Sequence, residues 1–409
     1  MTIKSTRSLA PCFYSVAIDI LGYGLVYPLI AAIFAGEHSD FFAKHHISSD
    51  THFFYLSAIY VLYPLFMLFG SSFITDLADT LGRKKVLILS MALLCLSFWL
   101  MGNSVEQESF VIFLCGRALS GFAAGSQPLA HSCVAELSPL RFKARNLGII
   151  AVCQATGLIL GPLIGGIFSD ANLNPGFGYE VPFYIAAGAA GAGAIWMAFS
   201  LEETRAKGAK ESVFNVLRPI FIFLDVFKQK SLRIVAFGFL LMQIAFGVYF
   251  QIISIFLKDI FRYQSWELGL YYAFLGAAFP VGLGFARYLS SRISMQAGVL
   301  WGLFALSASL SIAALSLSHE LVWFAGFLFA VTDMLAYVSM IRAFSHALEK
   351  KRQHWNAGTF GALIGVGFII SGFCPNLLDV INTESILFVA SAIAAIAWLT
   401  MTMHYKVSK

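Results

Sequence analysis

The chain has 409 residues, of which 59% are hydrophobic and only 12% are charged. This balance excludes an ordinary water-soluble domain, in which about half of the residues are apolar and about a quarter are charged. The formal net charge of +5 is compatible with nucleic-acid binding, so the placement of the basic residues has to decide between nucleic acid and membrane.

Twelve apolar runs are long enough to form membrane-spanning helices, since a helix needs about 20 apolar residues to cross roughly 30 Å of hydrocarbon. The runs are 9–34, 53–74, 86–101, 110–134, 147–168, 183–199, 234–257, 268–285, 297–317, 322–341, 357–373 and 386–403. They are about twice as long as a barrel strand and do not alternate in polarity. We therefore expect an all-α integral membrane protein, with the first run retained rather than cleaved as a signal peptide.

The basic residues lie almost entirely on one side of these spans. With the amino terminus inside, the outer loops contain only Lys44, Lys258 and Arg262 of the 27 Lys and Arg residues, and Arg117 lies within a span. The positive-inside rule then predicts that both termini are cytoplasmic, in a multi-pass protein of the cell (inner) membrane. The membrane explains the basic charge, so we expect no nucleic-acid partner.

A charged segment divides the spans into two sets of six. We expect an amino-terminal bundle at 1–200, a cytoplasmic linker at 201–233 and a carboxy-terminal bundle at 234–409. Apolar residues recur every three or four positions in the second part of the linker, which predicts an amphipathic helix on the membrane surface. These residues are Val213, Val216, Leu217, Ile220 and Leu224.

The first span contains an acid, Asp19, and the fourth contains a base, Arg117. A charge in the hydrocarbon costs at least about 2.5 to 3.5 kcal/mol when it is unpaired, so each side chain needs a cavity or a partner. Counting about 1.5 Å per residue places the two at similar depths. Asp19 is a candidate proton-carrying carboxylate, and the alternative is a permanent Asp19–Arg117 ion pair that only holds the bundle together.

The loop after the second span carries a specific motif, with Asp79 followed by Gly82, Arg83 and Lys84. It resembles the signature of the major facilitator superfamily, although Thr75 stands where that signature begins with glycine. The resemblance implies that Asp79, Gly82 and Arg83 belong to a cytoplasmic gate. A loop that is basic only because it lies inside the cell is the simpler alternative.

In the fourth span, Arg117 is followed by Gly121, Pro128 and His131 on one helical face, which we expect to line the solute cavity. The stretch from Arg117 to Gly125 also resembles a second motif of the same superfamily. Gln127 is a further polar candidate for the cavity. Glu136 lies at the cytoplasmic end of this span, where a gate contact is the expected role.

The fifth span contains Gly157, Gly161, Pro162 and Gly165. Glycines four residues apart allow close helix approach, and proline bends a helix, so a general packing motif is one interpretation. As a whole the stretch resembles the motif of the antiporter branch of the superfamily. That resemblance favours export.

The carboxy-terminal half has fewer signals. Asp333 lies in the tenth span without a basic residue nearby in sequence, and it is either a protonatable site or a polar contact for the solute; hydrogen bonding within the bundle is the structural alternative. Gln243 and Gln251 are polar groups that we assign to the cavity, although core hydrogen bonding explains them equally well.

The segment from Asp19 to Pro28 is similar to the first helix of drug/proton antiporters such as the tetracycline exporters. The resemblance implies a secondary active transporter that exports a small organic solute in exchange for protons by alternating access. A proton-coupled importer of a nutrient, metabolite or metal-chelate is the alternative, and a non-transporting membrane receptor or enzyme is a remote one.

We expect no enzymatic activity, no cofactor and no metal site, because no nucleotide loop, nucleophile motif or metal-ligand spacing is present. His38, His45 and His46 would bind a metal weakly at most, and a solvated outer loop explains them. The expected partners are the solute, protons and membrane lipid, and we expect a monomer.

Overall fold

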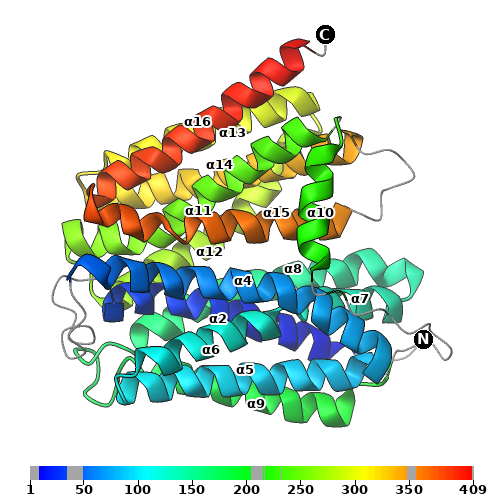
Figure 1. Cartoon of the computed structure of the whole chain (residues 1–409), viewed down its shortest axis with the longest axis vertical. Helices are drawn as coiled ribbons and strands as arrows, with labels where there is room; N and C mark the ends of the chain where they lie inside the picture. Colours follow the sequence, from blue (N-terminus) through cyan, green and yellow to red (C-terminus); the bar gives the residue numbers. More distant parts are fainter. Residues whose placement is uncertain are drawn as a thin grey trace. The chain divides into compact units, whose positions relative to one another are not determined.

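The structure is a computed structural model that describes residues 9–34, 49–203, 215, 217–230, 232–347 and 356–407. All the regular elements in these ranges are helices (Figure 1). The three outer-loop histidines lie outside the described residues, as do Val213 and Val216 of the predicted linker helix.

Twelve of the described helical segments are long and apolar enough to cross a membrane, which confirms the predicted number of spans. In chain order the helices are α2 (Ala10–Phe34), α4 (Ser49–Leu81), α5 (Arg83–Glu106), α6 (Phe110–Ala124), α7 (Gln127–Leu137), α8 (Leu140–Ile167), α9 (Val181–Ser200), α10 (Arg218–Lys228), α11 (Arg233–Phe261), α12 (Ser265–Ser290), α13 (Met295–Ala314), α14 (His319–Ala347), α15 (Asn356–Ser371), the 3₁₀ helix η2 (Cys374–Asp379) and α16 (Thr383–Val407). Most helices extend beyond the predicted apolar runs, because a helix continues into the polar interface after its last apolar residue.

The predicted fourth span is one run in the sequence but two helices in the structure. The N–H groups of Gly125 and Ser126 donate to the carbonyls of Phe122 and Ala123, three residues back, which tightens the chain between α6 and α7. Pro128 has no N–H to continue the regular α-helical ladder. The angular count that placed Arg117 and His131 on one face therefore does not hold across this break.

The predicted eleventh span is also divided in the structure, into an α-helix and a short 3₁₀ helix. α15 stops at Ser371, and the chain continues after Phe373 as the short helix η2, which begins at Cys374 and Pro375. Together Gly358–Asp379 are long enough to span the membrane.

The chain forms two compact units that do not follow a single cut in the sequence. Unit 1 comprises residues 1–33, 62–218 and 264–273, and unit 2 comprises residues 34–61, 219–263 and 274–409. In unit 1, α5 lies against both α6 and α9 (Figure 1). In unit 2, α13 packs against α14 and α16, and α11 packs against α15 and α16. The division at 201–233 into two six-helix bundles remains a prediction.

Within unit 1, α8 packs on α2 through a line of glycines. A Cβ atom built on Gly157 would lie 2.5 Å from the carbonyl oxygen of Ala17, and one on Gly165 would lie 2.6 Å from that of Leu25. A Cβ on Gly161 would collide with the carbonyl oxygen of Leu21. The contact residues on both helices recur every four positions, so the two backbones approach along a shared seam where only glycine fits.

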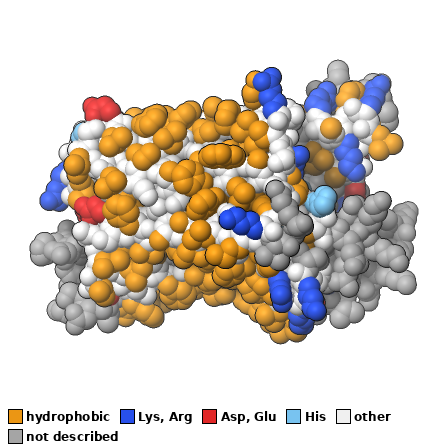
Figure 2. Space-filling view, turned by 90° about the horizontal axis from the view of Figure 1, so that it is seen from above, with side chains coloured by type: hydrophobic (Ala, Val, Ile, Leu, Met, Phe, Trp, Pro, Cys, Tyr) orange, Lys and Arg blue, Asp and Glu red, His pale blue; other side chains and the backbone are white. Residues whose placement is uncertain are grey.

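The surface agrees with a protein that lies in a membrane. Figure 2 shows a broad band of hydrophobic side chains over one face, with most of the Lys and Arg side chains gathered toward one end. Large apolar side chains such as Trp99, Phe199 and Trp301 are 49%, 87% and 64% exposed, which is unfavourable in water but favourable in lipid. Twelve spans of this kind are those of a multi-pass membrane protein.

Substituting Gly161 by Ala should destabilise the protein by about 1 to 3 kcal/mol, since the added methyl group must push α8 away from α2. Gly148→Ala is the matched control, because it lies on the same helix and has no atom within 4 Å of the added Cβ. Thermal unfolding of the two variants in detergent, followed by size-exclusion chromatography, measures the difference. Equal melting temperatures would mean that the seam does not hold the helices.

Candidate functional site

Asp19 lies in the interior of unit 1, on α2. Its side chain is only 2% exposed, and neither carboxylate oxygen has a hydrogen-bond partner of normal geometry. The side chain of Gln127, the first residue of α7, is the neighbouring polar group that acts on this carboxylate. The structure thus brings together two residues that the sequence placed in different roles, one for the proton and one for the cavity.

Arg117, on α6, is buried in the same unit, with 2% exposure. Its guanidinium carbon lies 4.9 Å from the centre of the Tyr63 ring, which is within the range of a cation–π interaction. No ion pair joins it to Asp19 in this part of the described chain. The structure therefore does not contain the Asp19–Arg117 pair that was the structural alternative.

Three tyrosines surround these charges. The Tyr27 hydroxyl donates a 2.8 Å hydrogen bond to that of Tyr23, and the Tyr23 ring lies 5.4 Å from the ring of Tyr63. The charges of both Asp19 and Arg117 act on Tyr63, so the acid and the base both lie near this side chain. The sequence analysis did not select these tyrosines, because only the fold brings α2 and α4 together around Arg117.

His131 lies one helical turn after Gln127 on α7. Its side chain is half-buried, and its Nε2 atom has no hydrogen-bond partner. Residues four apart share a helix face, so Gln127 and His131 form a polar edge on α7 that continues from the Asp19 carboxylate. The role of these two residues in a solute cavity remains a prediction.

The predicted gate residues also meet in unit 1. Arg83 forms an ion pair with Glu136, and the carboxylate of Asp79 lies close enough to act on the same guanidinium. Gly82 has a φ of 95°, a left-handed conformation that favours glycine, and a Cβ there would also collide with the carboxylate of Glu203. The glycine of the motif is thus required by the turn between α4 and α5.

Glu203 is a residue that the sequence analysis missed. Its carboxylate accepts hydrogen bonds from the backbone N–H groups of Arg83, at 2.9 Å, and Lys84, at 3.3 Å. These are first-turn N–H groups of α5, which have no acceptor within the helix, and a negative charge is favourable at a helix N-terminus. No local pattern signals this contact, because 120 positions separate Glu203 from Arg83.

Asp76 was missed as well. It is 1% exposed, and it forms a 3.0 Å ion pair with Arg218, the first residue of α10, while its other oxygen accepts from the N–H of Asn215 at 3.2 Å. An acid at the end of an apolar span is the sequence signal that could have identified it.

In unit 2, Asp333 of α14 is 2% exposed, and its Oδ1 atom has no hydrogen-bond partner. Its charge acts on Tyr337, one turn further along the same helix. Gln251 is also buried, but its amide group is engaged, since Nε2 donates to the Ser371 hydroxyl at 3.1 Å and Oε1 accepts from the Cys374 thiol at 3.7 Å. Gln243, 6% exposed, lies against the backbone of Gly367.

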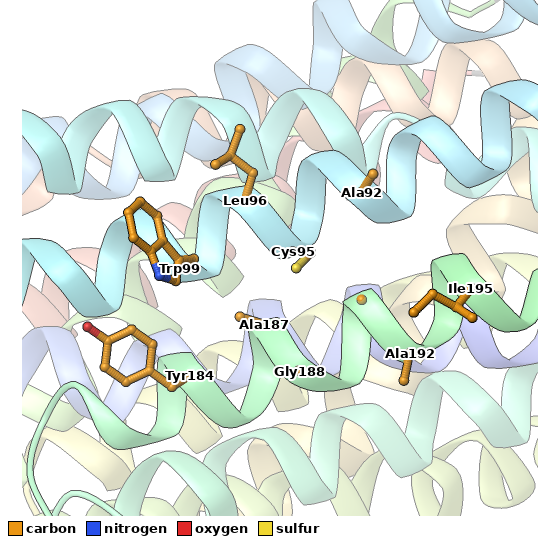
Figure 3. A pocket seen from close by; sticks show the side chains of 10 residues that line it. Ala92, Cys95, Leu96, Trp99, Tyr184, Ala187, Gly188, Ala192 and Ile195 are labelled. Atoms are coloured by element: carbon orange, nitrogen blue, oxygen red, sulfur yellow. The ribbon is translucent and has the colours of Figure 1, made fainter.

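A pocket of about 730 Å³ lies elsewhere, between α5 and α9 (Figure 3). Trp99 and Tyr184 stand at one end of it and Ile195 at the other, with small residues of α9 along its floor. Its lining contains no charged side chain and none of the predicted site residues. It is therefore a feature of the apolar surface and not part of the polar site around Asp19.

The family model described as Major Facilitator Superfamily matches residues 12–372. The chain belongs to this superfamily. The transporters of this superfamily are secondary transporters of solutes.

Relatives of this superfamily chain include resistance proteins of bacteria. It is 23% identical over 275 residues to the tetracycline resistance protein, class C, of Escherichia coli, covering 67% of this chain and 65% of that protein. It is 27% identical over 208 residues to the quinolone resistance protein NorA of Staphylococcus aureus, covering 51% of this chain and 48% of that protein. The match thus spans about half to two thirds of the length of these relatives.

Solved structures share the fold over nearly the whole chain. The human organic anion transporter MFSD10 (TETRAN) superposes with a TM-score of 0.67 at 18% identity, covering 98% of this chain and all of that one. At this level of identity the similarity establishes the fold alone.

Removing the Glu203 carboxylate should loosen the first turn of α5. Glu203→Ala leaves the N–H groups of Arg83 and Lys84 without their acceptor, at a cost of about 1 kcal/mol, so these amides should exchange with deuterium about fivefold faster. Mass spectrometry of peptides covering residues 82–86 measures the rate.

Glu202→Ala is the matched control for this experiment, because Glu202 is the exposed neighbour. Unchanged exchange in Glu203→Ala, or the same acceleration in both variants, would contradict the capping role.

Proposed function

We propose that the protein is a proton-coupled exporter of small amphipathic organic solutes, in which Asp19 carries the proton. The observation that supports this most directly is the Asp19 carboxylate, buried in a membrane span with both oxygens lacking a hydrogen-bond partner. An ionised carboxylate is costly in such a place, and a protonated one is much less so. Its proton occupancy therefore depends on whether water or a solute reaches it, which is what coupling requires.

We propose alternating access between the amino-terminal and carboxy-terminal six-helix halves, with both termini in the cytoplasm. In this mechanism the Arg83–Glu136 ion pair, Asp79 and the Gly82 turn form the cytoplasmic gate. The Arg83 side chain is 19% exposed and that of Glu136 is 52% exposed. Such a partly exposed pair contributes only about 0 to 1 kcal/mol, so it can break and re-form during each transport cycle.

The solute would bind next to the proton site, at the polar edge of Gln127 and His131 and the tyrosines around Arg117. Tyrosine rings offer an apolar surface together with hydroxyl groups, which suits an amphipathic solute. Asp333 would be a second protonatable group or a polar contact for the solute in unit 2.

The membrane potential can drive this export. One proton that moves down 100 mV provides about 2.3 kcal/mol, enough for a solute concentration ratio approaching fiftyfold. Export also agrees with the resistance to tetracycline and quinolones for which relatives of the chain are named, and with the α8 glycine motif.

Proton-coupled import of a nutrient, metabolite or metal-chelate is the second candidate. Arg117 favours it, because a buried guanidinium beside tyrosines is suited to an anionic metabolite as well as to structural packing. The direction of proton movement separates the two candidates.

The test is solute-induced proton movement in liposomes that contain the purified protein and a pH-sensitive dye. Cationic drugs, sugars, organic acids and metal chelates serve as trial solutes. Proton movement opposite to the solute is the expected result, whereas movement in the same direction would establish import and overturn the exporter proposal.

In the same assay, Asp19→Asn should abolish solute-coupled proton movement, because the amide cannot release a proton yet has nearly the shape of the protonated carboxyl. Asp19→Glu keeps an ionisable group and is the control that should retain part of the coupling. Size-exclusion chromatography establishes that both variants are folded. Coupling at the wild-type level in Asp19→Asn would remove the proton role from this residue.

A further inference from the structure

The linker helix α10 has an apolar face that no part of the described chain covers. Leu217, Ile220, Phe221 and Leu224 are 51%, 36%, 54% and 48% exposed. Ile220, Phe221 and Leu224 lie on one side of the helix, and Leu217, in the turn directly before α10, continues this stripe. Four large apolar side chains in one stripe are unusual on a surface that faces water.

The opposite side of α10 packs against another helix of unit 2, α15. Pro219 and Val226 are buried, and the Ile222 side chain lies 3.5 Å from a Cβ atom built on Gly358 of α15. At 100° per residue these three lie about 180° from the exposed stripe. The stripe is thus exposed on a helix that is held in place from behind, so its exposure does not result from a detached segment.

α10 is also oriented differently from the spans of unit 2. It is 11 residues long, about 16 Å, which is too short to cross the hydrocarbon. In Figure 1 it runs across α11 and α15 rather than along them. A helix that crosses membrane spans in this way lies close to parallel with the membrane surface.

The chain before α10 is fixed to the end of α4. The buried Asp76 carboxylate binds both the Arg218 guanidinium and the N–H of Asn215. Asp76 lies near the end of α4, shortly before the basic signature motif, so Arg218, the first residue of α10, lies at the same end of the spans of unit 1 as that motif. This position places α10 at the boundary between hydrocarbon and lipid headgroups.

The charges that follow the stripe are mostly basic. Lys228 at the end of α10 is followed by Lys230 and Arg233, and all three side chains are exposed. Asp225 is the single acid among residues 217–233, and it forms a 2.8 Å ion pair with Lys228. An excess of basic charge beside an apolar stripe matches the anionic headgroups and acyl chains of a phospholipid leaflet.

We propose that α10 is an interfacial helix that docks on the cytoplasmic leaflet of the membrane. Leu217, Ile220, Phe221 and Leu224 insert between the acyl chains, while Lys228, Lys230 and Arg233 contact the phosphates of anionic phospholipids. The Asp76–Arg218 ion pair holds the start of the helix at the depth where this insertion is possible.

The test uses a matched pair of phenylalanines. A fluorescent amino acid replaces Phe221, on the exposed stripe, or Phe223, which lies about 160° around the helix and packs 5.1 Å from the Phe227 ring. The full-length protein is reconstituted in vesicles that contain doxyl-labelled lipid as a quencher. We expect at least twofold stronger quenching at 221 than at 223; equal quenching, or a water-like emission at 221, would overturn the proposal.

Two further comparisons identify what covers the apolar stripe of α10. Quenching at 221 should be stronger in phosphatidylglycerol vesicles than in phosphatidylcholine vesicles, and the double variant Lys230→Gln, Arg233→Gln should remove this difference. No difference between the two lipids in the wild-type protein would overturn the role of the basic residues. If emission at 221 responds to protein concentration and not to the quencher, a second copy covers the stripe and the lipid proposal fails.

Discussion

Close contact between helix backbones at glycine is the constraint on which the amino-terminal site depends. Lipid is as apolar as the helix surfaces, so there is no hydrophobic force between spans, and close packing has to hold them together. α8 meets α2 at Gly157, Gly161 and Gly165, and Gly121 of α6 faces the carbonyl oxygen of Tyr63 on α4. These contacts fix α2, α4 and α6, which carry Asp19, Tyr63 and Arg117. The glycine contacts between the helices, and not attraction between charged side chains, therefore set the positions of Asp19 and Arg117.

Because glycine packing holds the helices, the fold does not need an ion pair between Asp19 and Arg117. A buried ion pair would compensate part of the cost of two charges in the membrane, and it would also bind the two helices permanently. Instead the Tyr63 ring stands beside the guanidinium, and Asp19 keeps an unoccupied hydrogen-bonding capacity next to Gln127. The glycine contacts between α8 and α2 involve backbone atoms, so this packing does not use the Asp19 carboxylate.

Side-chain contacts join the linker to the region of the signature motif between α4 and α5. Glu203, at the start of the linker, caps α5, and Asp76, near the end of α4, binds Arg218 in the middle of the linker. Both sides of the intervening segment are therefore attached to the same α4–α5 turn. In the Asp76–Arg218 pair the acid is buried and the base is 41% exposed, whereas in the Arg83–Glu136 pair the acid is 52% exposed and the base 19%.

The sequence by itself determined the twelve spans, the Gly82 turn and the glycine seam of α8, because length, hydropathy and residue spacing act locally along the chain. It also singled out Asp19, Arg117 and Asp333, because a charge within a long apolar run is visible without a fold. Only the tertiary structure decided which groups surround those charges. Tyr63 beside Arg117, Glu203 at the N-terminus of α5 and Asp76 on Arg218 join positions far apart in the chain, and the 3₁₀ turn at Gly125 and Ser126 changed the helical phase on which the predicted cavity face relied. Local spacing cannot report such contacts, since they arise only when helices that are distant in sequence pack together.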